Sequence, residues 1–176
     1  MRELMFILAL VLLAACSGIF GQGGTATRPE DFQVQYDWSE GSLPPPYHYE
    51  YTVLIEPDGQ AEVRMTPDYP GPGVPTWTET FSLTPEELDS LYAQMLAQGL
   101  ERENWAEEDD PPVGGSSAWV VVTSRGKEIR IPAFVVSRQA AKAQALREAV
   151  RSVVPQPIWD ELDVLREAYI AEHPDR

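Results

Sequence analysis

Side chains that build most catalytic and metal sites are scarce in this sequence. Its 176 residues include one cysteine and two histidines. One cysteine forms no intramolecular disulfide, and zinc sites need Cys and His residues clustered at short spacing, which this chain lacks. Lys and Arg number 13 against 28 Asp and Glu. Because such an acidic balance repels phosphate groups, we expect no nucleic-acid partner and favour a basic protein partner.

Sequence motifs of common enzymes are missing as well. The chain has no G-x-S-x-G elbow and no G-x-x-x-x-G-K-[ST] phosphate loop. His48 falls on the polar face of a predicted strand and His173 lies near the C-terminus, so we interpret both as ordinary surface histidines. Nucleophilic catalysis needs a base beside the nucleophile. We therefore expect no catalytic residue, no cofactor and no metal, and a non-enzymatic protein.

The one long hydrophobic run lies near the N-terminus. Residues 4–15 are all apolar, but a transmembrane helix needs roughly 20 such residues. The length is typical of a signal-peptide core. The run ends in Leu13-Ala14-Ala15 directly before Cys16. This tetrapeptide resembles the lipobox of bacterial lipoproteins.

The lipobox resemblance implies both a cellular location and a membrane anchor. By it, residues 1–15 are a lipoprotein signal peptide, the Cys16 thiol carries a diacylglycerol, and the new amino group takes a further acyl chain such as palmitate. The protein would lie in the cell envelope, on the extracytoplasmic face of a bacterial membrane. Ser17 resembles the outer-membrane pattern, while the inner membrane stays open. Because Glu3 offsets Arg2, an uncleaved anchor and a plain secretory leader are the alternatives.

Composition divides the remainder of the chain. Residues 16–30 begin with the lipidated cysteine and mix Gly, Ser, Thr and Pro, which predicts a flexible tether. Residues 31–176 are long enough for one hydrophobic core without disulfides. We therefore predict a single acidic domain over 31–176.

Alternation of apolar and polar residues predicts a sheet. Strands are expected over 32–38, 47–55, 61–66, 76–83, 118–123 and 128–134. The turn sequence "EPDGQ" at 56–60 predicts a hairpin from 47 to 66, and "SRGK" at 124–127 predicts a second hairpin. Connections this short indicate mostly antiparallel pairing.

Three helices are expected around this sheet. Thr84 caps the first, with Pro85 at its first position and Glu87 completing a capping box. An apolar stripe follows at Leu88, Leu91, Tyr92 and Met95, and Gly99 stands where a left-handed C-cap belongs. Ser137 is expected to cap a helix over 138–153, and Pro157 to open one over 157–172. The class is α+β: a mostly antiparallel sheet of hairpins packed against one capped helix and two C-terminal helices.

An acidic run within 101–110 raises the question of a cation. Calcium takes six to eight oxygen ligands at an ordered spacing. The run lacks the D-x-D-x-D-G register, and its neighbouring prolines restrict wrapping. We interpret it as a solvated acidic loop, with calcium as the alternative; its members are Glu101, Glu103, Glu107, Glu108, Asp109 and Asp110.

A tyrosine stripe is the other unusual feature. Tyr47, Tyr49 and Tyr51 share one face of a predicted strand, and Trp38 lies near them if the first two strands pair. Rigid aromatic side chains form ligand platforms for sugars or peptides. More often they pack under a helix, so we favour a core role and keep the platform as the alternative.

Three functions remain open at this point. The first is a non-enzymatic lipoprotein whose domain binds or supports another envelope component. The second is a protease inhibitor: the order of hairpin, capped helix, hairpin and helix loosely resembles emfourin-type inhibitors of metalloproteases, with "TPDYPGPGVP" at 66–75 as the exposed loop. The third is a carboxylate-based hydrolase, because two Asp or Glu residues suffice for glycosidases. Nothing in the sequence places such a pair in a cleft.

Overall fold

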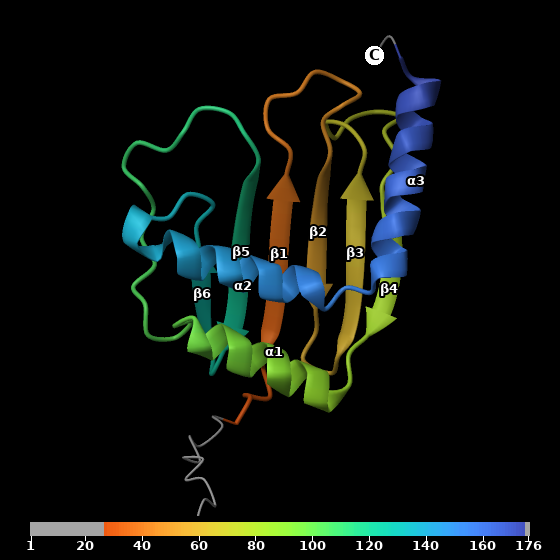
Figure 1. Cartoon of the computed structure of the whole chain (residues 1–176). Helices are drawn as coiled ribbons and strands as arrows, with labels where there is room; N and C mark the ends of the chain where they lie inside the picture. The colour runs from red at the N-terminus through yellow and green to blue at the C-terminus, as the bar shows by residue number, and fades with distance from the viewer. Residues whose placement is uncertain (1–26, 175–176) are drawn as a thin grey trace, which may run out of the picture.

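A six-stranded antiparallel sheet forms the centre of the computed structural model, which describes residues 27–174 (Figure 1). In space the strands follow the order β4-β3-β2-β1-β5-β6. The chain builds outward from β1 to the β4 edge, then returns to pair β5 with the other side of β1. The bounds are β1 Gln33–Ser39, β2 Glu50–Ile55, β3 Gln60–Thr66, β4 Trp77–Ser82, β5 Ser117–Ser124 and β6 Lys127–Ile131.

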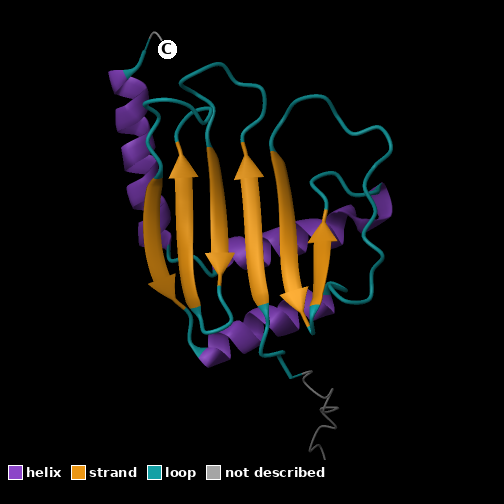
Figure 2. Cartoon of the chain, turned by 180° about the vertical axis from the view of Figure 1, so that it is seen from behind, coloured by secondary structure: helices purple, strands orange, loops and turns teal. Residues whose placement is uncertain are grey.

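All three α-helices lie on one face of the sheet (Figure 1). They are α1 Pro85–Ala97, α2 Ala140–Ser152 and α3 Gln156–Glu172. Helices α1 and α2 cross the strands, whereas α3 runs along the β4 side. From behind, the opposite face of the sheet carries no helix (Figure 2). The predicted α+β class, with its antiparallel sheet, capped helix and two C-terminal helices, is confirmed.

Local turn chemistry fixes the two predicted hairpins. Between β2 and β3, Gly59 has a φ of 89°, and a Cβ there would lie 2.3 Å from the carbonyl oxygen of Leu83. Only glycine fits that position. Between β5 and β6, Arg125 and Gly126 have φ angles of 55° and 70°. Two consecutive positive φ angles match the twist of a two-residue hairpin.

The start of α1 has the predicted capping box. The Glu87 backbone N–H donates to the Thr84 hydroxyl at 3.2 Å, and the Thr84 N–H donates to the Glu87 carboxylate at 2.8 Å. Pro85 stands in the first turn. Beyond the helix, Gly99 has a φ of 89°, as expected for a left-handed cap.

The core fills the single layer between the sheet and the helices. Alternate residues of β1, β2, β3 and β5 point into it, and α1 and α2 cover them. The predicted stripe of α1 is buried throughout. Fully buried members from the other elements include Val34, Val53, Ile55, Val63, Val120, Val122, Leu146 and Val150.

Several predicted boundaries are wrong by a few residues. Strand β2 begins at Glu50 and not at residue 47. Strand β6 ends at Ile131, because the next residue, Pro132, has no N–H for the ladder. Ser137 does not cap a helix: Ser137–Gln139 forms a 3₁₀ turn, and α2 begins at Ala140 without a side-chain cap.

The described chain enters the domain at its lower end, beneath β1 (Figure 1). Arg28, which the composition assigns to the tether, is fixed there: its Nε lies 2.8 Å from an Asp89 carboxylate oxygen of α1. The loops that precede β2 and β4 lie at the opposite, upper end, and the long segment between α1 and β5 rises from the lower end to the upper end (Figure 1). The point where the described chain enters the domain is therefore separated from the loops before β2 and β4 by the full length of the strands.

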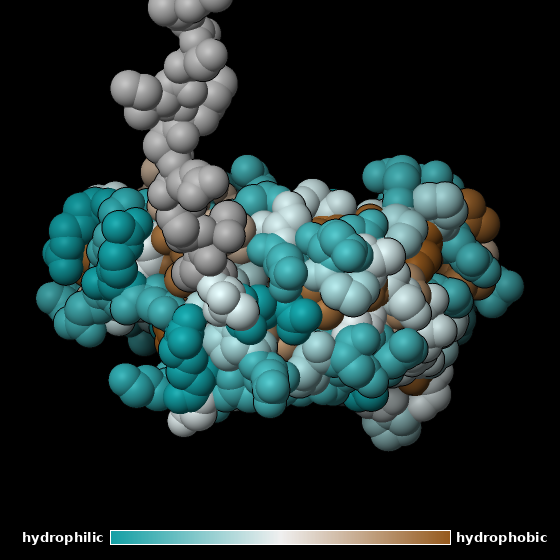
Figure 3. Space-filling model, turned by 90° about the horizontal axis from the view of Figure 1, so that it is seen from below, coloured by the Kyte–Doolittle hydropathy of each residue, from teal (hydrophilic) through white to brown (hydrophobic). Residues whose placement is uncertain are grey.

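Hydrophilic side chains predominate on the part of the lower end that is visible in Figure 3. In the view from below, the visible described residues are mainly hydrophilic, with scattered hydrophobic side chains (Figure 3). Across residues 27–174, no helix is both long and apolar enough to cross a bilayer.

Acid is expected to weaken the fold through the carboxylates whose pKa the fold lowers, which are Asp31, Glu101 and Glu103. Backbone N–H groups of Gly126 and Arg125 hold the pKa of Asp31 below its usual range. Partial burial opposes ionisation of Glu101, but hydroxyl donors from β5 and α1 hold its pKa below the usual range too. A lowered folded-state pKa adds stability above the unfolded value and loses it as pH falls through the folded value. Urea unfolding should show a constant free energy down to about pH 5 and a decline below about pH 4.

The Asp31→Asn variant tests whether the Asp31 carboxylate contributes to this acid sensitivity. It should be less stable than wild type at neutral pH and lose less stability in acid, because its turn contact no longer titrates. Asp110→Asn, at an exposed position, is the matched control and should follow the wild-type profile. If Asp31→Asn also follows that profile, the assignment of acid sensitivity to Asp31 is wrong.

Candidate functional site

Stacked aromatic rings occupy the upper part of the helix-bearing face. Trp38 of β1 is paired with Tyr51 of β2, and their rings stack with centroids 5.2 Å apart. Tyr49, just before β2, contacts the Trp38 ring at 4.7 Å. Trp159 of α3 meets the Tyr51 ring edge-on at 5.0 Å. These rings form one continuous stack that joins the sheet to α3.

Two arginines cap this stack from the helices. The Arg166 guanidinium of α3 lies 4.1 Å from the centre of the Tyr49 ring, and that of Arg151, near the end of α2, lies 5.4 Å from the Trp159 ring. The Arg166 Nε is buried without a hydrogen-bond partner. We name this group the arginine–aromatic cluster; it comprises Trp38, Tyr49, Tyr51, Trp159, Arg151 and Arg166.

The cluster is positive in a strongly negative protein. The chain has a formal net charge of -15, yet within residues 27–174 neither Arg151 nor Arg166 forms an ion pair. Ring stacking orients the planar guanidinium and leaves its edge N–H groups available. Those groups match the oxygens of a carboxylate or a phosphate.

The tyrosines of the cluster are suited to binding and not to proton abstraction. Burial raises the pKa of Tyr49 and of Tyr51, with the nearby arginines only partly opposing it. Both hydroxyls therefore stay protonated at neutral pH. The Tyr51 hydroxyl is buried. The cluster thus offers hydrogen-bond donors but no base.

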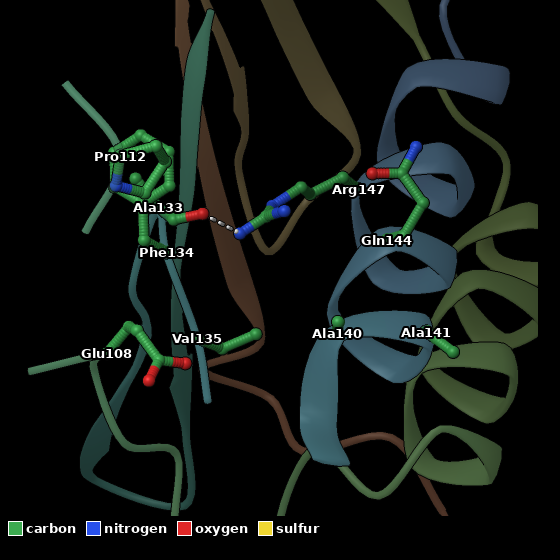
Figure 4. A pocket seen from close by; sticks show the side chains of 9 residues that line it. All are labelled: Glu108, Pro112, Ala133, Phe134, Val135, Ala140, Ala141, Gln144 and Arg147. Carbon is green, nitrogen blue, oxygen red and sulfur yellow. Dashed lines mark hydrogen bonds between the residues drawn. The ribbon is translucent and has the colours of Figure 1, made fainter. Parts of the chain in front are cut away.

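A separate cavity of about 500 Å³ lies between α2 and the segments 108–112 and 133–135 (Figure 4). Glu108 and Arg147 lie on different sides of it, and small alanines of α2 line its helix wall. The Arg147 guanidinium donates to the carbonyl oxygens of Pro132 and Ala133 at 2.7 and 2.8 Å. We name this cavity the α2 pocket; its defining residues are Glu108, Phe134, Val135, Ala141, Gln144 and Arg147.

A second cavity, of about 420 Å³, lies between α3 and the start of β4. Its walls include Trp77, Tyr169 and His173. The rings of Tyr169 and His173 stack at 4.2 Å, and Trp77 meets Tyr169 edge-on at 6.5 Å. The aromatic groups here contact one another.

The acidic run does not gather around one point. Glu101 accepts hydrogen bonds from Tyr92 and Ser124, Glu103 pairs with Lys142, and Glu108 lines the α2 pocket. Across residues 27–174 there is no group of three or more His, Cys, Asp or Glu side chains arranged to hold a metal. Each of the two cavities described above has a single carboxylate in its wall, Glu108 in one and Glu172 in the other.

The interpretation of His48 as a surface residue is wrong. Its side chain is 4% exposed and stacks on the Tyr69 ring, with centroids 3.8 Å apart and planes at 3°. Because β2 begins only at Glu50, His48 belongs to the preceding loop and not to the polar face of a strand. The stack joins the loops before β2 and β4. His173 is half-buried at the end of α3.

The tyrosine stripe divides between core and surface. Tyr51 is 5% exposed, as the core interpretation predicts, whereas Tyr47 is 49% exposed. Tyr49 is half-buried beneath Arg166. The residue predicted to carry the lipid, Cys16, lies outside the described residues 27–174.

Sequence reasoning missed the arginines of both sites. Arg147 and Arg151 stand four residues apart on the predicted helix over 138–153, so they share one helix face. The four-residue spacing of Arg147 and Arg151 was the feature of the sequence that could have pointed to these arginines. That two arginines of the cluster have no acidic partner became visible only once the helices were placed against the sheet.

Comparison with known proteins adds no family. No protein-family description matches the chain, and no curated protein matches its sequence. A two-layer α+β fold supports many unrelated functions. Function must therefore be inferred from the residues of the sites.

Proposed function

We propose that this protein is a lipid-anchored, non-enzymatic binding module of a bacterial cell envelope. Its arginine–aromatic cluster would take an anionic group, a carboxylate or a phosphate, of an envelope partner. The single observation that carries the proposal is the pair of arginines without acidic partners over the aromatic stack. In a chain with 28 acidic residues, arginines left unpaired in the described fold are available to a ligand.

The position of the cluster supports this role. It lies toward the upper end of the strands, whereas the described chain enters from below β1 (Figure 1). A lipid on Cys16 would therefore hold the domain by the end farther from the cluster. The cluster would face away from the anchoring membrane and toward other envelope components.

The charge of the remaining surface limits the kinds of partner that can bind. The acidic surplus repels extended polyanions, so a long anionic polymer is a poor ligand for two arginines surrounded by carboxylates. A protein that presents one anionic group within a basic surface would pair that group with the two arginines and would be attracted by the acidic surface around them. This is the chemistry that we assign to the partner.

In-cell crosslinking tests the cluster. A photo-crosslinking residue at the exposed position Asp163 of α3 should capture the partner, and the Arg151→Gln/Arg166→Gln double variant should lower the yield at least about tenfold. Each charge-assisted hydrogen bond contributes roughly 1.5–3 kcal/mol, which corresponds to about tenfold or more in affinity. The yield is measured on blots against the amount of protein.

Matched controls separate binding from folding. Arg102→Gln removes an exposed arginine away from the aromatic stack and should leave the yield unchanged. The same photo-crosslinker at Thr80, on the bare face of the sheet, should capture far less of the partner. Equal yields from wild type and from the folded double variant would contradict the proposed role of the cluster.

A further inference from the structure

We propose that the α2 pocket is a second binding site, for a short peptide with free amino and carboxyl termini. Glu108 would take the ammonium group, Arg147 the carboxylate, and the apolar wall between them the body of the peptide. The site shares no residue with the arginine–aromatic cluster, so this inference does not rest on the proposed function.

Opposite charges face the same cavity without neutralising each other. Glu108 and Arg147 both line it, yet within residues 27–174 neither side chain forms an ion pair. The Arg147 Nε is buried without a hydrogen-bond partner. A buried unpaired donor is unfavourable, and Arg147 carries this donor at the wall of the pocket.

The arginine end is fixed before any ligand arrives. One nitrogen of the Arg147 guanidinium donates to the carbonyl oxygens of Pro132 and Ala133 at 2.7 and 2.8 Å. These bonds use only part of the five N–H donors of arginine. Burial lowers the pKa of Arg147, but a guanidinium keeps its charge in proteins. The remaining donors are therefore held in place for a carboxylate.

At the acidic end, hydrogen bonds hold the backbone of the loop that carries Glu108. The Glu108 N–H donates to the Phe134 carbonyl at 2.8 Å, which pairs this loop with the segment after β6. Gln139, only 2% exposed, holds the same loop: its side chain donates to the Asn104 carbonyl at 2.9 Å and accepts from the Ala106 N–H at 3.1 Å. The buried glutamine explains why an acidic loop lies in one defined place.

The space between the charges suits a small apolar body. The cavity of about 500 Å³ falls within the roughly 300–1,000 Å³ typical of ligand pockets. Phe134 and Val135 form one wall and Ala141 part of the other, with Gln144 at the side as an amide partner for a peptide bond (Figure 4). A ligand with one charge would leave the opposite side chain unpaired. A zwitterion with an apolar middle would pair with both Glu108 and Arg147 and would place its apolar part against the wall between them.

Calorimetric titration of the full chain in a non-ionic detergent tests this site. The probes are Ala, Ala-Ala and Ala-Ala-Ala, together with N-acetylated and C-amidated forms of each. At least one free peptide should bind, and each single cap should weaken it at least about tenfold, because one charge-assisted contact is lost. Equal binding of free and capped forms, or no binding of any free form at millimolar concentration, would overturn the proposal.

Variants at the pocket complete the test without disturbing Arg147, which supports the chain after β6. Glu108→Gln should weaken the free peptide about tenfold and remove the preference for it over the N-acetylated form. Ala141→Leu, at an exposed helix position, should fill the pocket and abolish binding. Ala93→Leu on α1 is the matched control and should bind as wild type does.

The arginine–aromatic cluster provides an independent comparison. The folded Arg151→Gln/Arg166→Gln variant should bind the peptides with wild-type affinity, since neither residue lines the α2 pocket. Peptide binding that survives Glu108→Gln and Ala141→Leu but is lost in this double variant would place the peptide in the cluster and refute the site proposed here.

Discussion

A Cys16→Ala variant is expected to lose all incorporation of a palmitate analogue that wild-type protein acquires in cells. The thiol is the only one in the chain, so no other cysteine replaces it. Intact-mass analysis should show wild type beginning at a lipidated Cys16 and the variant keeping residues 1–15, because the predicted cleavage follows lipidation. The effect is all-or-none, unlike any substitution in the folded domain.

The strength of membrane attachment is a second measurement that tests the predicted lipidation of Cys16. A single acyl chain binds a bilayer only marginally, whereas two or three hold a protein firmly. Wild type should therefore resist extraction by salt and enter the detergent phase on phase separation. Ser17→Ala keeps the thiol and should label as wild type does. If wild type and Cys16→Ala label equally little, the lipobox prediction is wrong and a plain leader or an uncleaved anchor replaces it.

The parts of the fold that sequence predicted correctly depend on local chemistry. The capping box at Thr84 and Glu87, the glycine turn at Gly59 and the Arg125-Gly126 turn each need only a few neighbouring residues. Alternation then placed Val53 and Ile55 on the buried face. These signals are short-range, so they are visible without knowing what packs against them.

The errors arose where a distant segment decides the structure. His48 was assigned to a strand by alternation, but stacking on Tyr69 from another loop holds it outside β2. The sequence predicts Ser137 as a helix cap, yet Gln139, two residues later, hydrogen-bonds to the loop at 104–106, and the helix begins after it. In both cases a long-range contact outweighs the local preference.

The candidate sites could be predicted only in part for the same reason. The sequence shows the aromatic side chains of Trp38, Tyr49 and Tyr51, but which ring faces are covered depends on where α3 lies. Trp159 covers Tyr51, and Arg166 covers Tyr49. The α2 pocket brings Glu108 and Arg147 together across 39 positions of sequence, since 147 − 108 = 39. No spacing rule joins residues so far apart.

Because α3 joins the sheet through few large side chains, Trp159→Ala is expected to destabilise the domain strongly. Trp159 is 9% exposed and contacts Tyr51 edge-on at 5.0 Å. Truncating a buried tryptophan lowers the free energy of unfolding by about 3–5 kcal/mol. For a chain of this size, that corresponds to a fall in Tm of roughly 6–20 °C. Thermal unfolding followed by circular dichroism measures it.

Hydrogen exchange should show where the stability is lost. The other buried side chains of α3 are Leu162 and Tyr169, so without Trp159 the first half of the helix keeps few contacts with the sheet. Amides of α3 should exchange faster while those of β1 and β5 stay protected, because weakly packed elements open locally. Trp159→Phe keeps an aromatic ring against Tyr51 and should lose less stability. Val164→Ala, at a position 65% exposed on the same helix, should change stability by less than about 0.5 kcal/mol. Because alanine favours a helix more than valine does, a loss as large as that of Trp159→Ala would contradict the assignment of α3 stability to the tryptophan contact.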